Sequence, residues 1–296
     1  MYIGCLVLLV ISPCSHAADE FELTFSDVNV VLLADPTLPQ VGHQAVRAWV
    51  TQAVDGVRAY LGEFPVEQLF LAIHVRGPRG VTRGQALATD PPTLNITMGA
   101  RTTPTQLRND WVLVHEMVHL AVPSQPRRHR WFEEGLAVYA ESIIRLHAGL
   151  KTRRHLWRDF YEGMPLGSRA FGEAGLDGAS RWGRVYWAST TFMLRADVAA
   201  AMTGRPAWPR IFRAWRQRGW DIRSRVSMAE LIEAGDAALA TPLLRQHFDR
   251  YAKEPGELQA RTLLKRLGVM LRNGQLVVDD AAAAAAARQR IEQPLS

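Results

Sequence analysis

Long apolar runs are missing from the chain after its N-terminal segment. Nothing there approaches the roughly 20 consecutive apolar residues that a membrane-spanning helix needs, which excludes a protein with several transmembrane helices. The chain has no collagen-like period, and its 48% hydrophobic and 22% charged residues are ordinary for a folded soluble protein, which excludes a mostly disordered chain. A length of 296 residues is enough for one large domain or two small ones.

Cysteine is nearly absent. The chain has two cysteines, Cys5 and Cys14, and both lie in the N-terminal segment. Residues 1–17 combine a short apolar run with a small-x-small pattern ending at Ala17, which is typical of a signal peptide, although no Lys or Arg precedes the run. We therefore expect an exported protein, periplasmic or secreted. Cleavage after Ala17 would leave no thiol, so disulfides carry no information about the compartment. The alternative is a lipid anchor at Cys14, which Pro13 fits poorly and which would be the only contact with a membrane.

Lysine is also scarce, so the net charge of +6 comes almost entirely from arginine. The arginines are spread along the chain, and their densest groups lie at 127–130 and 153–154. Solvated arginines in an arginine-rich composition explain this pattern, and the alternative is a patch that attracts an acidic partner. We do not expect nucleic acid as a partner.

The first third of the chain alternates between strand and helix patterns. Strands are expected over 28–33, 69–75 and 93–98, and apolar residues at helical spacing predict a helix over 40–61. Glycine and proline punctuate 77–84, which indicates a loop.

From residue 104 onward nearly everything is expected to be helical. Proline is favoured at the first position of a helix, so Thr103-Pro104 predicts a helix start, and Pro123 and Pro126 close that helix. Asn273-Gly274 between two apolar runs predicts a hairpin over 268–278. Further helices are expected over 131–147, 182–201, 207–218, 227–239 and 241–253, and a final one over the alanine run 281–287.

These elements predict four segments and a site between two of them. Residues 1–17 form the leader, 18–103 an N-terminal α/β lobe, 104–203 a helical lobe, and 204–296 a C-terminal helical region with a short hairpin. The cleft between the first two lobes is the expected place for a functional site.

The segment from His115 to His119 reads His-Glu-Met-Val-His and is the most informative motif of the chain. On a helix, positions i and i+4 lie on the same face, so two imidazoles at this spacing can bind one metal ion. Every other residue of 111–122 is apolar, which predicts a helix that is buried nearly all round. Burying these polar side chains without partners would cost several kcal/mol, which a metal ion would offset. The alternative is a pair of core histidines bonded to backbone groups.

Zinc needs a third protein ligand and leaves its fourth position open. A histidine six residues after His119 is one known solution, but Gln125 stands there, and His129 fits no familiar spacing. Glu134 is the better candidate, since residues 120–133 are long enough to turn the chain and start a second helix beside the first. Gly135 would let those two helices approach closely.

Glu141 lies two helical turns beyond Glu134, on the same face. It is a candidate for holding a ligand histidine through its other ring nitrogen, as carboxylates around metal sites do. The alternative for these acidic residues is a solvated helix face, and this is the interpretation we favour for Glu133.

The His-Glu-x-x-His motif at 115–119, followed by Trp-Phe-x-Glu-Gly-x-Ala at 131–137, resembles the gluzincin metallopeptidases. This superfamily includes the aminopeptidase N and glycyl aminopeptidase types. The resemblance implies an α+β fold, in which a small mixed β-sheet lobe packs on a mainly helical zincin lobe, with further C-terminal helices. It implies Zn²⁺ as the cofactor, with His115, His119 and Glu134 as its ligands and Glu116 as the general base.

The resemblance extends to Val-Tyr-Trp-Ala-Ser at 185–189, which is similar to a segment of the aminopeptidase N type whose tyrosine stabilises the oxyanion. It therefore implies a catalytic Tyr186, and the alternative is a core aromatic residue. Those aminopeptidases also carry Gly-x-Met-Glu-Asn, whose glutamate grips the free amine of the substrate, whereas residues 84–88 here hold no glutamate. The strand over 93–98 is still expected to bind an extended peptide by edge pairing.

We therefore expect a zinc metallopeptidase that hydrolyses peptide bonds of a peptide or protein substrate through a zinc-activated water, with Glu116 as the base. One alternative is a non-catalytic, gluzincin-like zinc- or peptide-binding protein of the cell envelope. Another is a basic module that binds nucleic acid or anionic envelope polymers through Arg127, Arg128, Arg130, Arg153 and Arg154. The intact metal motif argues against the basic module as the main function.

Overall fold

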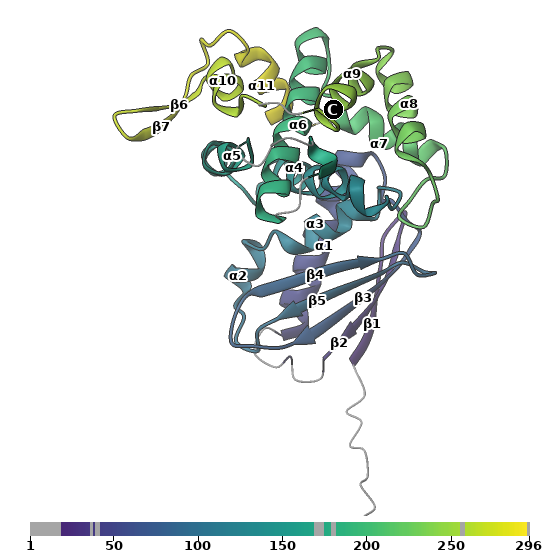
Figure 1. Ribbon diagram of the computed structural model, residues 1–296. Coiled ribbons are helices and arrows are strands. Elements are labelled where there is room, and N and C mark those ends of the chain that lie inside the picture. Colours follow the sequence, from purple (N-terminus) through teal and green to yellow (C-terminus); the bar gives the residue numbers. More distant parts are fainter. Residues whose placement is uncertain are drawn as a thin grey trace, which may run out of the picture.

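A five-stranded mixed sheet and a layer of helices packed on one of its faces make up the molecule (Figure 1). The computed structural model describes residues 19–35, 38, 42–168, 175–178, 182–254 and 258–294. This is the expected α+β architecture, while the predicted leader at 1–17 lies outside the described residues. None of the described helices combines the length and the apolar character needed to cross a membrane.

The strands lie in the order β1-β2-β3-β5-β4. β2 (Asn29–Ala34), β3 (Gln68–Val75) and β5 (Thr93–Met98) are parallel to one another. β1 (Asp19–Thr24) and β4 (Val81–Leu87) are antiparallel to their neighbours and form the two edges. The three central strands are the ones that the sequence predicts.

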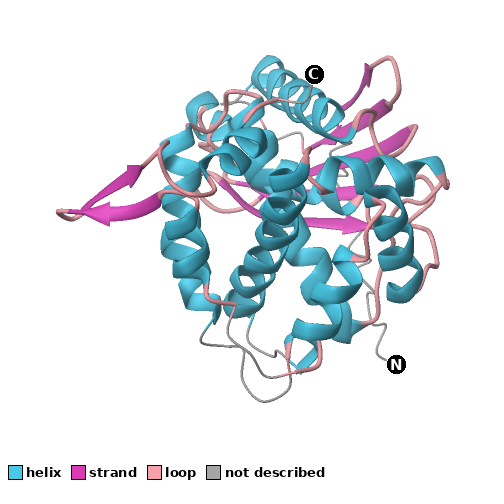
Figure 2. Ribbon diagram, turned by 90° about the horizontal axis from the view of Figure 1, so that it is seen from above, coloured by secondary structure: helices cyan, strands magenta, loops and turns pink. Residues whose placement is uncertain are grey.

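Residues of the central strands alternate between a buried face and a partly exposed face, as a sheet covered on one side requires. Leu32, Leu71 and Ile96 are fully or almost fully buried on the covered face. The connection between β2 and β3 is α1 (Gly42–Leu61), whose apolar side belongs to the same core. Figure 2 shows the helical layer from above, with the sheet beneath it.

Two predictions about this sheet are wrong. β5 has no free edge, because it lies between β3 and β4, and so the available edge is that of β4. β4 itself begins at Val81, inside the stretch 77–84 that was expected to be a loop. Its residues are mostly exposed or half-exposed and show no strict apolar alternation, so the strand gives no clear signal in the sequence.

The single helix expected from Pro104 is in fact two. α2 (Pro104–Arg108) begins where Thr103-Pro104 predicts, and the structure adds a capping box between Thr103 and Gln106. The chain then turns, and the carboxylate of Asp110 accepts hydrogen bonds from the first backbone N–H groups of α3 (Val112–His119), both at 3.0 Å. This cap starts α3 afresh and directs it across the edge of the sheet.

The remaining chain is helical apart from one hairpin, and it includes two helices, α5 (Arg153–Ser168) and α10 (Ala260–Arg266), that none of the expected ranges covers. The hairpin turns at Asn273-Gly274, as predicted, and the last helix begins at Ala285, within the alanine run, and extends beyond it to Glu292. The elements are α4 (Arg130–His147), α5 (Arg153–Ser168), α6 (Trp182–Thr203), α7 (Trp208–Gln217), α8 (Met228–Leu239), α9 (Leu243–Tyr251), α10 (Ala260–Arg266), β6 (Val269–Arg272), β7 (Gln275–Val278) and α11 (Ala285–Glu292).

α4 and α6 cross at very close range. A Cβ atom added at Gly135 would lie 2.1 Å from the Cβ of Ser189, so only glycine allows this approach. The prediction that Gly135 brings the second helix against the first is therefore wrong, since the close partner is α6. Tyr139 on α4 adds a 2.6 Å hydrogen bond to the carboxylate of Asp197 on α6. These two contacts fix the position of α6 above His115, His119 and Glu134.

Candidate metal centre

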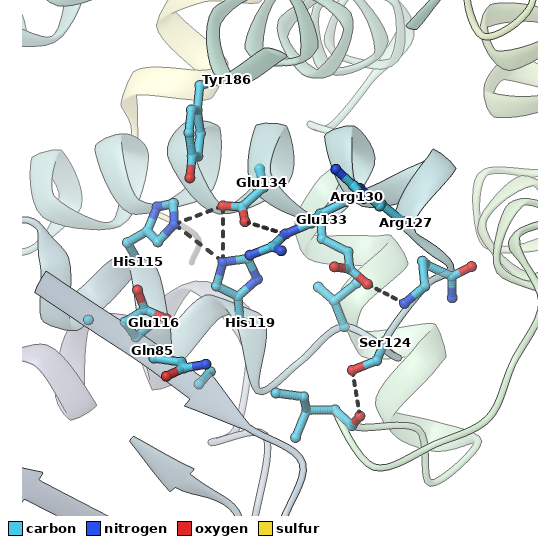
Figure 3. A pocket seen from close by; sticks show the side chains of 15 residues that line it. Gln85, His115, Glu116, His119, Ser124, Arg127, Arg130, Glu133, Glu134 and Tyr186 are labelled. Carbon is cyan, nitrogen blue, oxygen red and sulfur yellow. Dashed lines mark hydrogen bonds and ion pairs between the residues drawn. The ribbon is translucent and has the colours of Figure 1, made fainter. Parts of the chain in front are cut away.

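α3 and α4 bring three potential metal ligands together. The Nε2 atoms of His115 and His119 lie 3.2 Å apart, and Oε2 of Glu134 lies 3.4 Å and 3.5 Å from them, respectively. Among the described residues, these three form the group whose histidine and carboxylate atoms can hold one metal ion. Figure 3 shows the three side chains converging on one point between the two helices. These are the three ligands that the sequence predicts.

The donor geometry matches a zinc ion. With zinc–ligand bonds of about 2.0–2.2 Å in a tetrahedron, neighbouring ligand atoms lie roughly 3.3–3.6 Å apart, which is close to the three distances found here. His115 and Glu134 are buried and His119 is nearly so, so the site is shielded from bulk water on its protein side. Nitrogen and carboxylate donors are also the chemistry that zinc accepts.

The protonation states of two of the three side chains, His115 and Glu134, suit a metal as well. Burial lowers the pKa of His115 to about 4, which keeps its imidazole neutral and able to coordinate. Burial opposes the ionisation of Glu134, but hydrogen bonds from both histidines hold the pKa of that carboxyl well below its usual range. For His119, burial acts to lower the pKa, and the hydrogen bond and negative charge of Glu134 outweigh it and raise the pKa.

Glu116 does not point at the metal ligands but stands beside them, against the edge strand β4 (Figure 3). A backbone hydrogen bond from Ala86 holds its carboxylate, and burial raises its pKa. A Cβ atom added at Gly84 would lie 2.4 Å from Cγ and 2.7 Å from Oε1 of Glu116. Gly84 therefore leaves the space that the Glu116 side chain occupies.

Replacing Gly84 by alanine should displace this carboxylate. We expect Gly84→Ala to lower peptidase turnover by about tenfold or more, since catalysis is sensitive to shifts of about 1 Å, while metal content stays unchanged. Gly204→Ala is the matched control, because a Cβ atom there meets nothing within 4 Å. Steady-state rates and elemental analysis of both variants test this expectation. Unchanged turnover in Gly84→Ala would contradict the expectation that the edge strand β4 positions the Glu116 carboxylate.

Tyr186 lies on α6, on the opposite side of the ligands from Glu116. Its side chain is half-buried and its hydroxyl points toward Glu134 (Figure 3). Burial and the nearby negative charge of Glu134 raise its pKa well above the usual value, so the hydroxyl stays protonated and can donate a hydrogen bond. Its ring centroid is 6.3 Å from that of His115.

A cavity of about 480 Å³ surrounds these residues and opens between β4 and the helical layer. It occupies the predicted cleft between the two lobes. The lining includes polar side chains that are not metal ligands, namely Gln85, Glu116, Ser124, Gln125, Arg127, Arg130, Glu133 and Tyr186. Of these, Gln85, Ser124, Gln125 and Glu133 were not predicted to take part in a site, because none of them belongs to a metal-binding or catalytic motif, and Arg127 and Arg130 were considered only as members of a basic module.

The expectation of a solvated Glu133 is wrong. The side chain is half-buried, lines the cavity and accepts a hydrogen bond from the backbone N–H of Gln125. Burial raises its pKa to about 7. Arg130 forms an ion pair with Glu134, with 3.2 Å between Nε and Oε1, and so steadies the ligand carboxylate from the solvent side.

Glu141 and His129 lie away from the ligand cluster. Glu141 is buried on α4, accepts a 2.8 Å hydrogen bond from Ser142 and faces Arg145 at 3.6 Å. Among the described residues, Nδ1 of His115 has no hydrogen-bond partner, so a role of Glu141 in holding that ring stays a prediction. His129 is bonded to Asp177 at 2.9 Å and serves to anchor the turn before α4.

A second cavity, of about 510 Å³, meets the first at Tyr186. Its walls include Trp111, Leu166 and Trp187, and its floor is formed by charged residues such as Glu141 and Lys151. The side chains of Trp111 and Leu166 are 47% and 60% exposed, which places two of the large exposed apolar residues of the described chain in one hollow. Exposed apolar residues gathered in this way mark a binding surface.

Solved structures with a similar fold include M1 zinc metallopeptidases and an aminopeptidase N family protein. An aminopeptidase N family protein from Idiomarina loihiensis matches 86% of this chain with 12% sequence identity and a TM-score of 0.56, over 50% of its own length. An M1 zinc metallopeptidase from Deinococcus radiodurans matches 81% of this chain with 16% identity and a TM-score of 0.52, over 52% of its length. A variant of the Deinococcus enzyme bound to a Tyr-Ser-Ala substrate matches 81% of this chain with 13% identity and a TM-score of 0.54, over 53% of its own length.

These similarities show the fold, and they confirm at that level the resemblance to gluzincin metallopeptidases. The chain spans about half the length of the structures that it matches. No family model and no curated protein matches the sequence.

Proposed function

We propose that the chain is a zinc-dependent metallopeptidase. The observation that carries the proposal is the arrangement of His115, His119 and Glu134 at zinc-like separations, with Glu116 on one side and Tyr186 on the other. A structural role for the metal alone would need four closed ligands, whereas three protein ligands and an adjoining cavity are typical of a catalytic zinc.

Bound at this site, zinc would polarise the attacking water and the peptide carbonyl, and lower the pKa of the water toward about 7. Glu116 accepts the proton from that water and passes it to the leaving amine. The Tyr186 hydroxyl donates a hydrogen bond to the oxyanion that forms on the carbonyl. The edge strand β4 lines the same cavity and offers backbone N–H and C=O groups to an extended peptide.

The second cavity suits an apolar side chain of the substrate. Tyr186 lines this cavity as well as the first one, so the second cavity lies next to the proposed site of cleavage. Burial of a large apolar side chain there would contribute about 1.5–3 kcal/mol to substrate binding. The exported location expected from the leader is part of the same proposal.

Digestion of a broad peptide library by the zinc-loaded chain tests the proposal. We expect cleavage that stops on addition of a zinc chelator and returns with zinc, and an enrichment of large apolar side chains next to the cleaved bond. No cleavage by a chain that holds its zinc would favour the alternative, a non-catalytic zinc- or peptide-binding protein of the cell envelope.

The alternative of a basic module finds less support in the arrangement of the arginines. Arg153 forms ion pairs with Asp280 and Glu292 at 2.6 Å and 2.9 Å, so it is already neutralised. Arg130 is paired with the ligand Glu134. The two densest arginine groups therefore do not act together as a free cationic surface.

A further inference from the structure

We propose that Arg127 selects substrates that carry a carboxylate, either an acidic side chain or a free C-terminus, in the cavity beside the metal ligands. The inference deepens the proposed function, since it takes the ligand of this cavity to be a peptide. Arg127 would then determine specificity on the side of the cleft that lies away from the second cavity.

The acidic residues of this cavity are all engaged within the protein. Glu134 is held by the two histidines and by Arg130, Glu133 accepts the backbone N–H of Gln125, and Glu116 accepts that of Ala86. Each of these three carboxylates therefore already has a partner within the protein, and Gln85 offers only a neutral amide.

Arg127 differs from these residues. It lines the same cavity, its side chain is exposed, and no other described residue is hydrogen-bonded or ion-paired to that side chain. Arg130, its neighbour in Figure 3, is committed to Glu134. Arg127 is thus the cationic group of the described lining that can still pair with a ligand.

The backbone that carries Arg127 is fixed, as a recognition residue requires. Arg127 starts a short 3₁₀ turn, Arg127–His129, whose last residue is bonded to Asp177 at 2.9 Å. The indole N–H of Trp131 donates to the same carboxylate at 2.7 Å. The guanidinium is therefore presented from a fixed turn, and its planar donors match a carboxylate.

Four versions of one peptide test the inference. They carry Glu or Gln at one scanned position and a free or amidated C-terminus, and their affinity for the zinc-loaded Glu116→Gln chain is measured by fluorescence anisotropy at low salt. We expect the carboxylate peptides to bind about five- to tenfold more tightly than their amides, as a partly exposed charge pair supports. The preference for the side chain over the C-terminus identifies the source of the carboxylate.

Variants assign the effect to one residue. Arg127→Gln should bring the carboxylate and amide peptides within twofold of each other, whereas Arg127→Lys should keep part of the preference. Arg154→Gln is the matched control, since it makes the same change of charge at an exposed arginine that does not line the cavity. The inference would be overturned if Arg127→Gln and the unchanged chain showed the same preference for carboxylate peptides. It would also be overturned if the unchanged chain showed no such preference.

This result is separable from the peptidase proposal. A carboxylate preference in binding, with no cleavage of any peptide by the chain that retains Glu116, would refute the peptidase activity and leave the role of Arg127 intact. Cleavage without a carboxylate preference would do the reverse.

Discussion

Replacing Glu116 by glutamine should reduce peptide hydrolysis by about 10²–10⁴-fold while the metal stays bound, because the carboxylate accepts a proton and does not coordinate. Glutamine has nearly the same shape, so the contacts with Gly84 and the backbone of Ala86 remain available. The fall should therefore appear in kcat, with little change in KM. Steady-state kinetics on one fluorogenic peptide, together with elemental analysis, measures both quantities.

Glu233→Gln is the matched control for this variant, since Glu233 is exposed on α8 and lies outside the cavity. It should hydrolyse the peptide at the unchanged rate. If Glu116→Gln kept full activity, the general base would have to be another residue. A loss of zinc from Glu116→Gln would show instead that this carboxylate belongs to the ligand set.

Removal of the metal should lower the stability of the chain markedly. A ligand at about a thousand times its Kd stabilises the folded state by about 4 kcal/mol, which corresponds to a rise in Tm on the order of 10 °C for a domain of this size. The site adds to the effect, because without the metal the buried His115 and Glu134 face each other with fewer partners. Differential scanning calorimetry with and without a chelator measures the change.

His119→Ala should abolish this difference, since two remaining ligands hold zinc weakly. His155→Ala serves as the control, because His155 is exposed and lies outside the ligand group. It should retain the full shift. A Tm that does not change on chelation, in a chain shown to have lost its metal, would contradict the coupling of metal binding to stability.

The parts of the site that follow from local spacing could be predicted from sequence. The two histidines stand one helical turn apart, so any helix over this segment places them together. The apolar residues around them indicated burial, and the structure buries every residue from Val112 to Val118. Glu134 required a longer argument, from the length of the connecting segment and from the resemblance.

The parts that depend on packing between distant segments could not be predicted. Gly135 is next to a ligand, yet its close contact is Ser189 on α6, which no local pattern identifies. The edge strand β4 has a mixed, exposed sequence, and its importance comes from Gly84 lying over Glu116. Glu133 was expected to be solvated. Its hydrogen-bond partner, the backbone N–H of Gln125, is brought to it by the path of the loop, which no local pattern predicts.

The central claim is that His115, His119 and Glu134 hold one zinc ion, and the metal content of the purified chain from Ala18 onward tests it most directly. The chain is loaded with zinc, freed of unbound metal and analysed by elemental mass spectrometry beside His119→Ala. We predict about one zinc per chain in the unchanged protein and none in the variant. No zinc in the unchanged protein, or the same amount in both, would contradict the account.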